Sequence, residues 1–163
     1  TRPTVVVQIR RLARLESVAH TMDKMVSGDR EHRVLPEFQT GDTILMEVNG
    51  EAIAGVDLSQ LKPQQVQVSG RSVRVRLPPA QIFTVALDDE KTHVFERKTG
   101  ILVPVDPSLE GEVREQAVES LRQSAVAAGI LDKAHANACA TVTKLLLGLG
   151  FEQIGRASCR ERV

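Results

Sequence analysis

The sequence predicts an α+β domain: an antiparallel sheet of hairpins, with an N-terminal helix and two C-terminal helices packed on one face of the sheet. Three observations predict this fold. Near the start and through the last third, apolar residues recur at the spacing of a helix face. From about residue 43 to residue 105 they alternate with polar residues, as in strands. Glycine and proline residues interrupt that alternating stretch, which indicates tight turns.

The first predicted element is a helix. The apolar stripe from Val5 to Leu12 lies on one helical face, and we expect the helix to end at about Leu15. Residues 17–26 continue the stripe but also alternate weakly, so a helix and a strand both remain open there. Residues 27–29 predict a break, and residues 30–40 predict a polar loop.

A first hairpin is predicted next, with strands at residues 43–48 and 51–56. Asn49 and Gly50 separate them, and both residues tolerate the positive φ that a type I′ turn requires. Gly55 lies inside the return strand. A glycine there leaves room for a bulge or for a close approach of another backbone segment.

A second hairpin is predicted at residues 66–77. Alternating valines lead to Ser69 and Gly70 and away from them again, which indicates a turn between two strands. The two prolines at residues 78–79 end the second strand because neither can donate a backbone hydrogen bond.

Shorter elements surround the two hairpins. Residues 57–61 predict a helical turn that stops before Pro63. Residues 83–87 and 92–97 predict further strands, and residues 101–105 predict a short edge segment.

The last third predicts two helices. Asp106 is the expected N-cap of the first helix, and Pro107 suits its first position. Gly129 separates this helix from the second. The predicted apolar stripes are Leu109, Val113, Ala117, Leu121 and Ala125 in the first helix, and Leu131, Ala134, Ala138, Val142, Leu145 and Leu149 in the second.

The composition of the chain excludes several classes of function. The chain has 163 residues, enough for one domain with a real core. Its 21 basic and 21 acidic residues provide no general positive field, so we expect no nucleic-acid partner. No apolar run has membrane-spanning length and no signal peptide is visible, so this fragment is expected to be soluble.

The last ten residues predict a non-native tail. Ile154 to Val163 reads Ile-Gly-Arg-Ala-Ser-Cys-Arg-Glu-Arg-Val, and one back-translation of it resembles a common short-read sequencing adapter. We therefore expect a single domain over residues 1–153, truncated at both ends, followed by adapter read-through of the kind found in metagenomic assemblies. Setting Cys159 aside leaves Cys139 alone, so no disulfide within the chain is expected. Source DNA with other codons would contradict this interpretation.

Several segments together resemble a bacterial family of unknown function, DUF4230. They are Gly55-Val56-Asp57-Leu58-Ser59, Leu77-Pro78-Pro79-Ala80-Gln81-Ile82, Gly129-Ile130-Leu131, the Ala134 to Ala140 helix and Leu149-Gly150-Phe151. The resemblance implies membrane association through an anchor upstream of Thr1, on an undetermined side of the membrane. It implies no demonstrated activity and supplies no catalytic residues.

Few side chains suggest catalysis. Asp57 can act as a general base or metal ligand, but its setting favours a cap of the following turn. His93 is the other polar candidate. The histidines are scattered without ligand spacing, so neither a metal nor another cofactor is expected. No catalytic residue is predicted.

Three arginines form the best candidate binding patch. Arg71, Arg74 and Arg76 lie in the second hairpin, where alternation places Arg74 and Arg76 on one strand face. They suit an anionic partner or a lipid headgroup, although a solvated sheet face explains them as well. Arg10, Arg11 and Arg14 suit contact with anionic lipid if a membrane anchor precedes them. A solvated helix face explains them equally well.

The function predicted from these observations is non-enzymatic. It is that of a membrane-anchored interaction domain or an envelope-associated domain, with an unknown protein or lipid partner. A small-ligand or lipid binding module is the alternative. A hydrolase centred on Asp57 or His93 is a third hypothesis, which requires those two groups to meet in a concave site.

Overall fold

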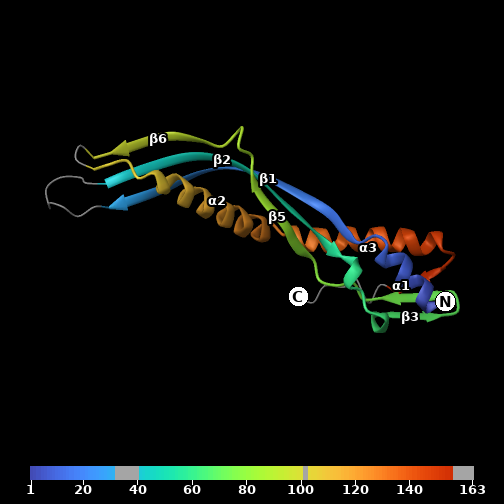
Figure 1. Ribbon diagram of the computed structural model, residues 1–163. Coiled ribbons are helices and arrows are strands. Elements are labelled where there is room, and N and C mark those ends of the chain that lie inside the picture. Colours follow the sequence, from blue (N-terminus) through green and yellow to red (C-terminus); the bar gives the residue numbers. More distant parts are fainter. Residues whose placement is uncertain (32–40, 101–102, 156–163) are drawn as a thin grey trace. The chain divides into compact units, whose positions relative to one another are not determined.

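The computed structural model describes residues 1–31, 41–100 and 103–155. It has the predicted α+β class, with an N-terminal helix, antiparallel strands with hairpins and two C-terminal helices (Figure 1). The elements are α1 (Arg2–Arg10), β1 (Arg14–Glu31), β2 (Gly41–Asp57), the 3-10 helices η1 (Leu58–Gln60) and η2 (Pro63–Gln65), β3 (Val66–Ser69), β4 (Ser72–Val75), β5 (Gln81–Leu87), β6 (His93–Thr99), α2 (Pro107–Ala127), α3 (Ile130–Gly148) and β7 (Gln153–Ile154).

The chain divides into two compact units. We call Thr1–Ala19, Ile53–Thr84 and Val126–Val163 the terminal unit, and His20–Ala52 with Val85–Ala125 the central unit. The strands β1, β2 and β5 contribute residues to both units. In the larger sheet β2 pairs with β1, β5 and β6, and the smaller sheet has the order β3-β4-β7.

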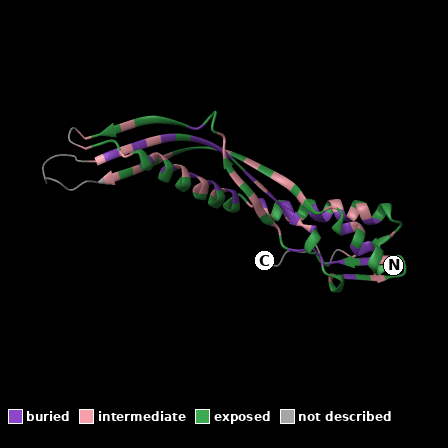
Figure 2. Cartoon of the chain, viewed as in Figure 1, coloured by how far each residue is buried: buried purple, intermediate pink, exposed green. Residues whose placement is uncertain are grey.

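The core of the central unit lies between β2 and α2. Every second residue of β2 from Asp42 to Val48 is buried, whereas the residues between them are half-buried or exposed, as Figure 2 shows along the strand. Such alternation is typical of a sheet with one packed face. The buried apolar side chains are Ile44, Met46, Val48, Leu109, Val113 and Ala117.

The core of the terminal unit joins α1, the 3-10 helices, the small sheet and α3. The helix α1 contacts β3, η1, η2 and α3, and α3 contacts β7. Its large buried side chains include Val5, Ile9, Leu58, Leu61 and Leu146. The second predicted stripe is only partly right, because Ile130 and Leu146 are buried in α3 while Leu149 is exposed beyond its end.

The N-terminal helix is shorter than predicted. It ends at Arg10, and Ala13, with φ of 48°, precedes β1. The open stretch at residues 17–26 is strand throughout. Pairing of β1 with β2 supplies the backbone hydrogen bonds, so tertiary context selects the alternating pattern over the helical stripe.

The turn predicted at Asn49 and Gly50 is wrong, because β2 runs through both residues. Among the described residues only Ala13 combines a side chain with positive φ, and Gly50 is not a positive-φ glycine. A Cβ on Gly50 would lie 2.3 Å from Leu121 Cδ1 and 3.0 Å from the Ala86 carbonyl oxygen. Gly50 therefore provides space for close packing of α2 and β5 on the strand.

The break predicted at residues 27–29 is also wrong. Gly28 lies within β1, and a Cβ there would come within 2.3 Å of Val113 Cγ2. Gly55, by contrast, fulfils the prediction of a close backbone approach: its Cβ would lie 2.0 Å from the Leu15 carbonyl oxygen.

The remaining turn and cap predictions are mostly right. Gly70, with φ of 57°, forms the β3–β4 turn, and Gly129, with φ of 78°, separates α2 from α3. The first stripe is buried as predicted. Of the loop predicted at residues 30–40, residues 32–40 lie outside the described residues. Residues 101–102 of the predicted edge segment also do, and residues 103–105 form no strand.

Cys139 lies on α3 in the core of the terminal unit. The expectation of no disulfide within the chain depends on setting aside Cys159, which lies outside the described residues.

Candidate functional site

The β3–β4 hairpin has one buried face and one polar face. Val66 pairs with Val75 and Val68 with Val73, and these valines turn toward the core of the terminal unit. Arg74 pairs with Gln67 on the exposed face. The alternation predicted for this hairpin is therefore present in the structure.

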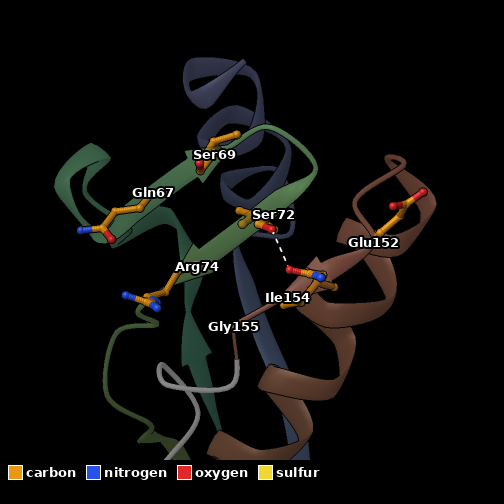
Figure 3. A pocket seen from close by; sticks show the side chains of 10 residues that line it. Gln67, Ser69, Ser72, Arg74, Glu152, Ile154 and Gly155 are labelled. Carbon is orange, nitrogen blue, oxygen red and sulfur yellow. Dashed lines mark hydrogen bonds between the residues drawn. The ribbon is translucent and has the colours of Figure 1, made fainter.

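A hollow of about 650 Å³ lies on the polar face, between the hairpin and the segment that follows α3 (Figure 3). The parallel strand β7 forms part of its wall, because Ser72 and Val73 of β4 pair with Gln153 and Ile154. The lining residues are Gln67, Val68, Ser69, Ser72, Val73, Arg74, Glu152, Gln153, Ile154 and Gly155. Ile154 and Gly155 belong to the stretch assigned above to adapter read-through.

The three predicted arginines have different surroundings. Arg71, in the turn, forms an exposed ion pair with Glu152 at 2.8 Å. Arg74 lines the hollow, where a Cβ on Gly155 would lie 3.3 Å from its Nε atom. Arg76 is exposed just beyond β4 and does not line the hollow. Only Arg74 presents its guanidinium to the hollow without an ion pair of its own among the described residues.

The hollow offers hydrogen-bond donors and one carboxylate. Its guanidinium, serine hydroxyls and glutamine amides are the donors that carboxylate or phosphate groups accept from. The carboxylate, Glu152, forms an ion pair with Arg71, and the Ser72 hydroxyl donates to Gln153 Oε1 at 3.1 Å. The described contacts therefore do not pair a serine of the hollow with a general base, as nucleophilic catalysis needs.

Asp57 is a cap, as its setting predicted. Its carboxylate accepts from the Ser59 backbone N–H at 3.1 Å, the Ser59 hydroxyl at 2.5 Å and the Gln60 amide at 3.1 Å. These bonds, those of the Ser59 hydroxyl first, lower the pKa of Asp57 below its usual value. A carboxylate held in this way is a weak general base.

His93 begins β6, and its Nε2 atom lies 3.4 Å from Glu47 Oε2. Asp57 belongs to the terminal unit and His93 to the central unit, and the partners of each come from its own unit. The hydrolase hypothesis therefore gains no support from their surroundings.

Two of the three N-terminal arginines are engaged within the protein. Arg10 Nε donates to the Leu61 carbonyl at 2.8 Å, and the Arg14 guanidinium lies 4.1 Å from the centre of the Phe83 ring. Both contacts stabilise the terminal unit, the second as a cation–π interaction. Arg11 is exposed.

The most constrained polar group is Asp42, which the sequence interpretation missed. It is fully buried in the central unit and accepts from Arg97 Nε at 3.0 Å, from Arg97 Nη2, from Thr99 Oγ1 at 3.1 Å and from the Asp106 backbone N–H at 3.0 Å. One signal could have identified it: Asp42 has the parity of Ile44, Met46 and Val48 and therefore faces the core.

The surroundings of Asp42 explain its ionisation. The hydrogen bonds from Arg97 are the largest cause of a pKa held far below the usual value for aspartate, and burial opposes them. Arg97 Nη2 also donates to the Asp106 carbonyl at 2.8 Å, and Asp106 caps α2 by accepting from the Ser108 N–H at 2.9 Å. Asp42 thus joins β2, β6 and the start of α2 in a structural network.

Within residues 1–31, 41–100 and 103–155 there is no group of three or more histidine, cysteine, aspartate or glutamate side chains able to hold a metal ion. In the same residues no helix combines the length and hydrophobicity needed to span a bilayer.

The model of the family described as "Protein of unknown function (DUF4230)" matches residues 7–155, which is most of the chain. The chain belongs to the DUF4230 family. No curated protein and no solved structure shows significant similarity to it. The DUF4230 match ends at Gly155, beyond the segments that carry the resemblance in the sequence, and therefore includes β7.

Proposed function

We propose that this DUF4230 domain is a non-enzymatic interaction domain, anchored in a membrane or associated with the cell envelope. The observation that supports a non-enzymatic role is the structural use of its distinctive polar residues. Asp57 caps a turn, and Asp42 and Arg97 join three elements. The one carboxylate that lines the hollow beside Arg74, Glu152, forms an ion pair with Arg71. Catalysis by acid and base needs two positioned groups, and these residues have other partners.

The membrane part of the proposal places an anchor before Thr1, as the resemblance to the family implies. It is tested with a full-length family member that carries a topology reporter after the position of Phe151. We expect the product in the membrane fraction, resistant to high salt and released by detergent. A product found entirely in the soluble fraction would defeat the anchoring.

A second candidate function, binding of a small anionic ligand or lipid headgroup, rests on the hollow. Its volume lies within the range of ligand pockets, and serine and glutamine side chains supply further hydrogen-bond donors beside Arg74. A thermal-shift screen of carboxylates, phosphates and short-chain phospholipids tests it, because a ligand that binds the native state raises the unfolding temperature.

The screen has a matched control within the hairpin. Arg74→Gln removes the charge that lines the hollow, whereas Arg76→Gln removes an exposed charge two residues away. We expect a true ligand to lose its stabilising effect with the first variant and to keep it with the second. Equal losses would indicate attraction to general positive charge, and the absence of any stabilising compound would count against this function.

A further inference from the structure

The sheet of the central unit has one face that α2 does not cover. On β1, Val26 packs into the core and Gly28 meets Val113 of α2, so these residues face the helix. Met25 lies between Val26 and Lys24, whose Nζ donates to Ser120 Oγ of α2, and it is 46% exposed on the opposite side. On β2, the residues between the buried ones likewise turn away from α2. We call this side of β1, β2 and β6 the open face.

Contacts between side chains confirm which residues share the open face. Asn49 Nδ2 donates to Asp23 Oδ1 across β2 and β1, and His93 Nε2 lies 3.4 Å from Glu47 Oε2 across β6 and β2. On β6, Lys98 Nζ lies 3.3 Å from Glu96 Oε1. Among the described side chains, the charged residues of the open face are Asp23, Asp29, Glu47, Glu51, Glu96 and Lys98, with His93 beside them.

The open face is acidic, because its described side chains include five carboxylates and one lysine. Like charge disfavours an anionic lipid surface, a nucleic acid and the same face of a second copy of this chain. A partner with exposed lysine or arginine side chains would meet complementary charge. Charge complementarity therefore decides the kind of partner that fits here.

Apolar side chains accompany the charges. Leu45 of β2 is half-buried on this face, and Met25 of β1 is exposed on it. Phe95 is the extra residue of a β-bulge opposite Leu45 and Met46, where the alternation that assigns side chains to a face is interrupted. Methionine is enriched in protein interfaces.

We propose that the open face is the docking surface of the domain, and that its partner is a protein segment presenting basic side chains around an apolar residue. The inference rests on the proposed interaction function and adds the chemistry of the partner. Apolar contact with Met25 and Leu45 supplies affinity, and the carboxylates supply orientation and selectivity.

The test uses the 163-residue chain and a defined probe, a ten-residue peptide of alternating lysine and leucine. Its binding is followed by amide NMR shifts and by fluorescence anisotropy, with a peptide of alternating glutamate and leucine as the comparison. We expect shifts at residues 21–29, 43–49 and 93–98 with the basic peptide, and none with the acidic peptide.

Charge-reversal variants separate a docking surface from general attraction. Glu47→Lys combined with Glu96→Lys is expected to weaken binding of the basic peptide at least tenfold. Glu115→Lys combined with Glu119→Lys makes the same charge change on exposed residues of α2 and is expected to change affinity less than twofold. Equal weakening by the two pairs, or shifts outside the open face, would overturn the proposal.

An apolar variant tests the second element of the surface. Met25→Ser is expected to weaken binding of the basic peptide about fivefold. Val105→Ser removes a similarly exposed apolar residue before α2 and is expected to have no effect. Binding of phosphatidylglycerol vesicles through the open face would contradict the proposal. If the full-length protein is membrane-anchored but the chain binds neither peptide, the docking surface is contradicted and the proposed function still stands.

Discussion

At the scale of single residues, Asp42 connects more elements of the central unit than its place in a short Gly-Asp-Thr sequence suggests. Its carboxylate is enclosed by Arg97, Thr99 and the backbone of Asp106. A buried charge of this kind is tolerated only because its hydrogen bonds replace water. Removing it leaves the Arg97 guanidinium without its main partner.

We therefore expect Asp42→Asn to lower the free energy of unfolding by roughly 2 to 4 kcal/mol at neutral pH. Urea denaturation measures the change. Asp89→Asn is the control, because the Asp89 side chain is 90% exposed beside Arg114 and such surface pairs contribute little. A loss no larger than that of the control would show that the Asp42 network does not stabilise the fold.

The same residue predicts a dependence on pH. The folded-state pKa of Asp42 is lowered, so its ionisation stabilises the native state above the unfolded pKa of about 3.8. That stability is lost as the pH falls from about 4 through the lower folded pKa. Urea midpoints measured from pH 5 to pH 2 should therefore fall more steeply for the native sequence than for Asp42→Asn. Parallel curves would contradict this.

Two glycines provide a matched pair for backbone packing. Gly55→Ala places a methyl group 2.0 Å from the Leu15 carbonyl oxygen, so we expect a loss of about 3 kcal/mol or more, or failure to fold. Gly111→Ala, in open space on α2, should stabilise the chain by about 0.5 to 1 kcal/mol. Thermal unfolding measures both. A mild effect of Gly55→Ala would contradict the close approach of β1 and β2.

At the scale of elements, Gly129 ends α2 and allows α3 to begin. Its φ of 78° lies in the left-handed region, and a side chain there would meet no neighbour. Gly129→Ala should therefore cost about 1 to 2 kcal/mol from backbone strain alone. Gly129→Asn should cost less, because asparagine tolerates this conformation. Equal costs in thermal unfolding would point to a cause other than φ.

The elements also show how far the sequence could predict the fold. Helices with a cap, a stripe and a stop, such as α2, follow from local signals at Asp106, Leu109 and Gly129. The long strands β1 and β2 could not be predicted from local signals, because Gly28 and Gly50 resemble breaks and turns when only their neighbours in sequence are considered. Their actual role, space for the α2 side chains, depends on packing that only the folded chain contains.

The candidate site was predictable to a similar degree. Alternation placed Arg74 on an exposed strand face. The position of Asp57 before a short turn predicted its role as a cap. The hollow depends on β7 lying parallel to β4, a long-range pairing without a local signal. Asp42 was missed because a lone aspartate in a strand is read as polar surface unless its parity with buried neighbours is counted.

At the scale of the whole molecule, β1 and β2 each contribute to both units. Local damage to either core should therefore lower the stability of the entire chain. Met46→Ala in the central core and Leu146→Ala in the terminal core should each cost about 2 to 5 kcal/mol. Far-UV circular dichroism and hydrogen exchange, which need no tryptophan, should report one shared unfolding transition. Two separate transitions would show that the units unfold independently.

The bulge in β6 has a consequence beyond the fold itself. An edge strand that carries Val94 and Phe95 would, if regular, present an uninterrupted row of backbone donors and acceptors to other chains. The extra residue at Phe95 interrupts that row. We therefore expect the irregularity to hinder edge-to-edge self-assembly at high concentration, and a deletion that makes the strand regular to increase aggregation.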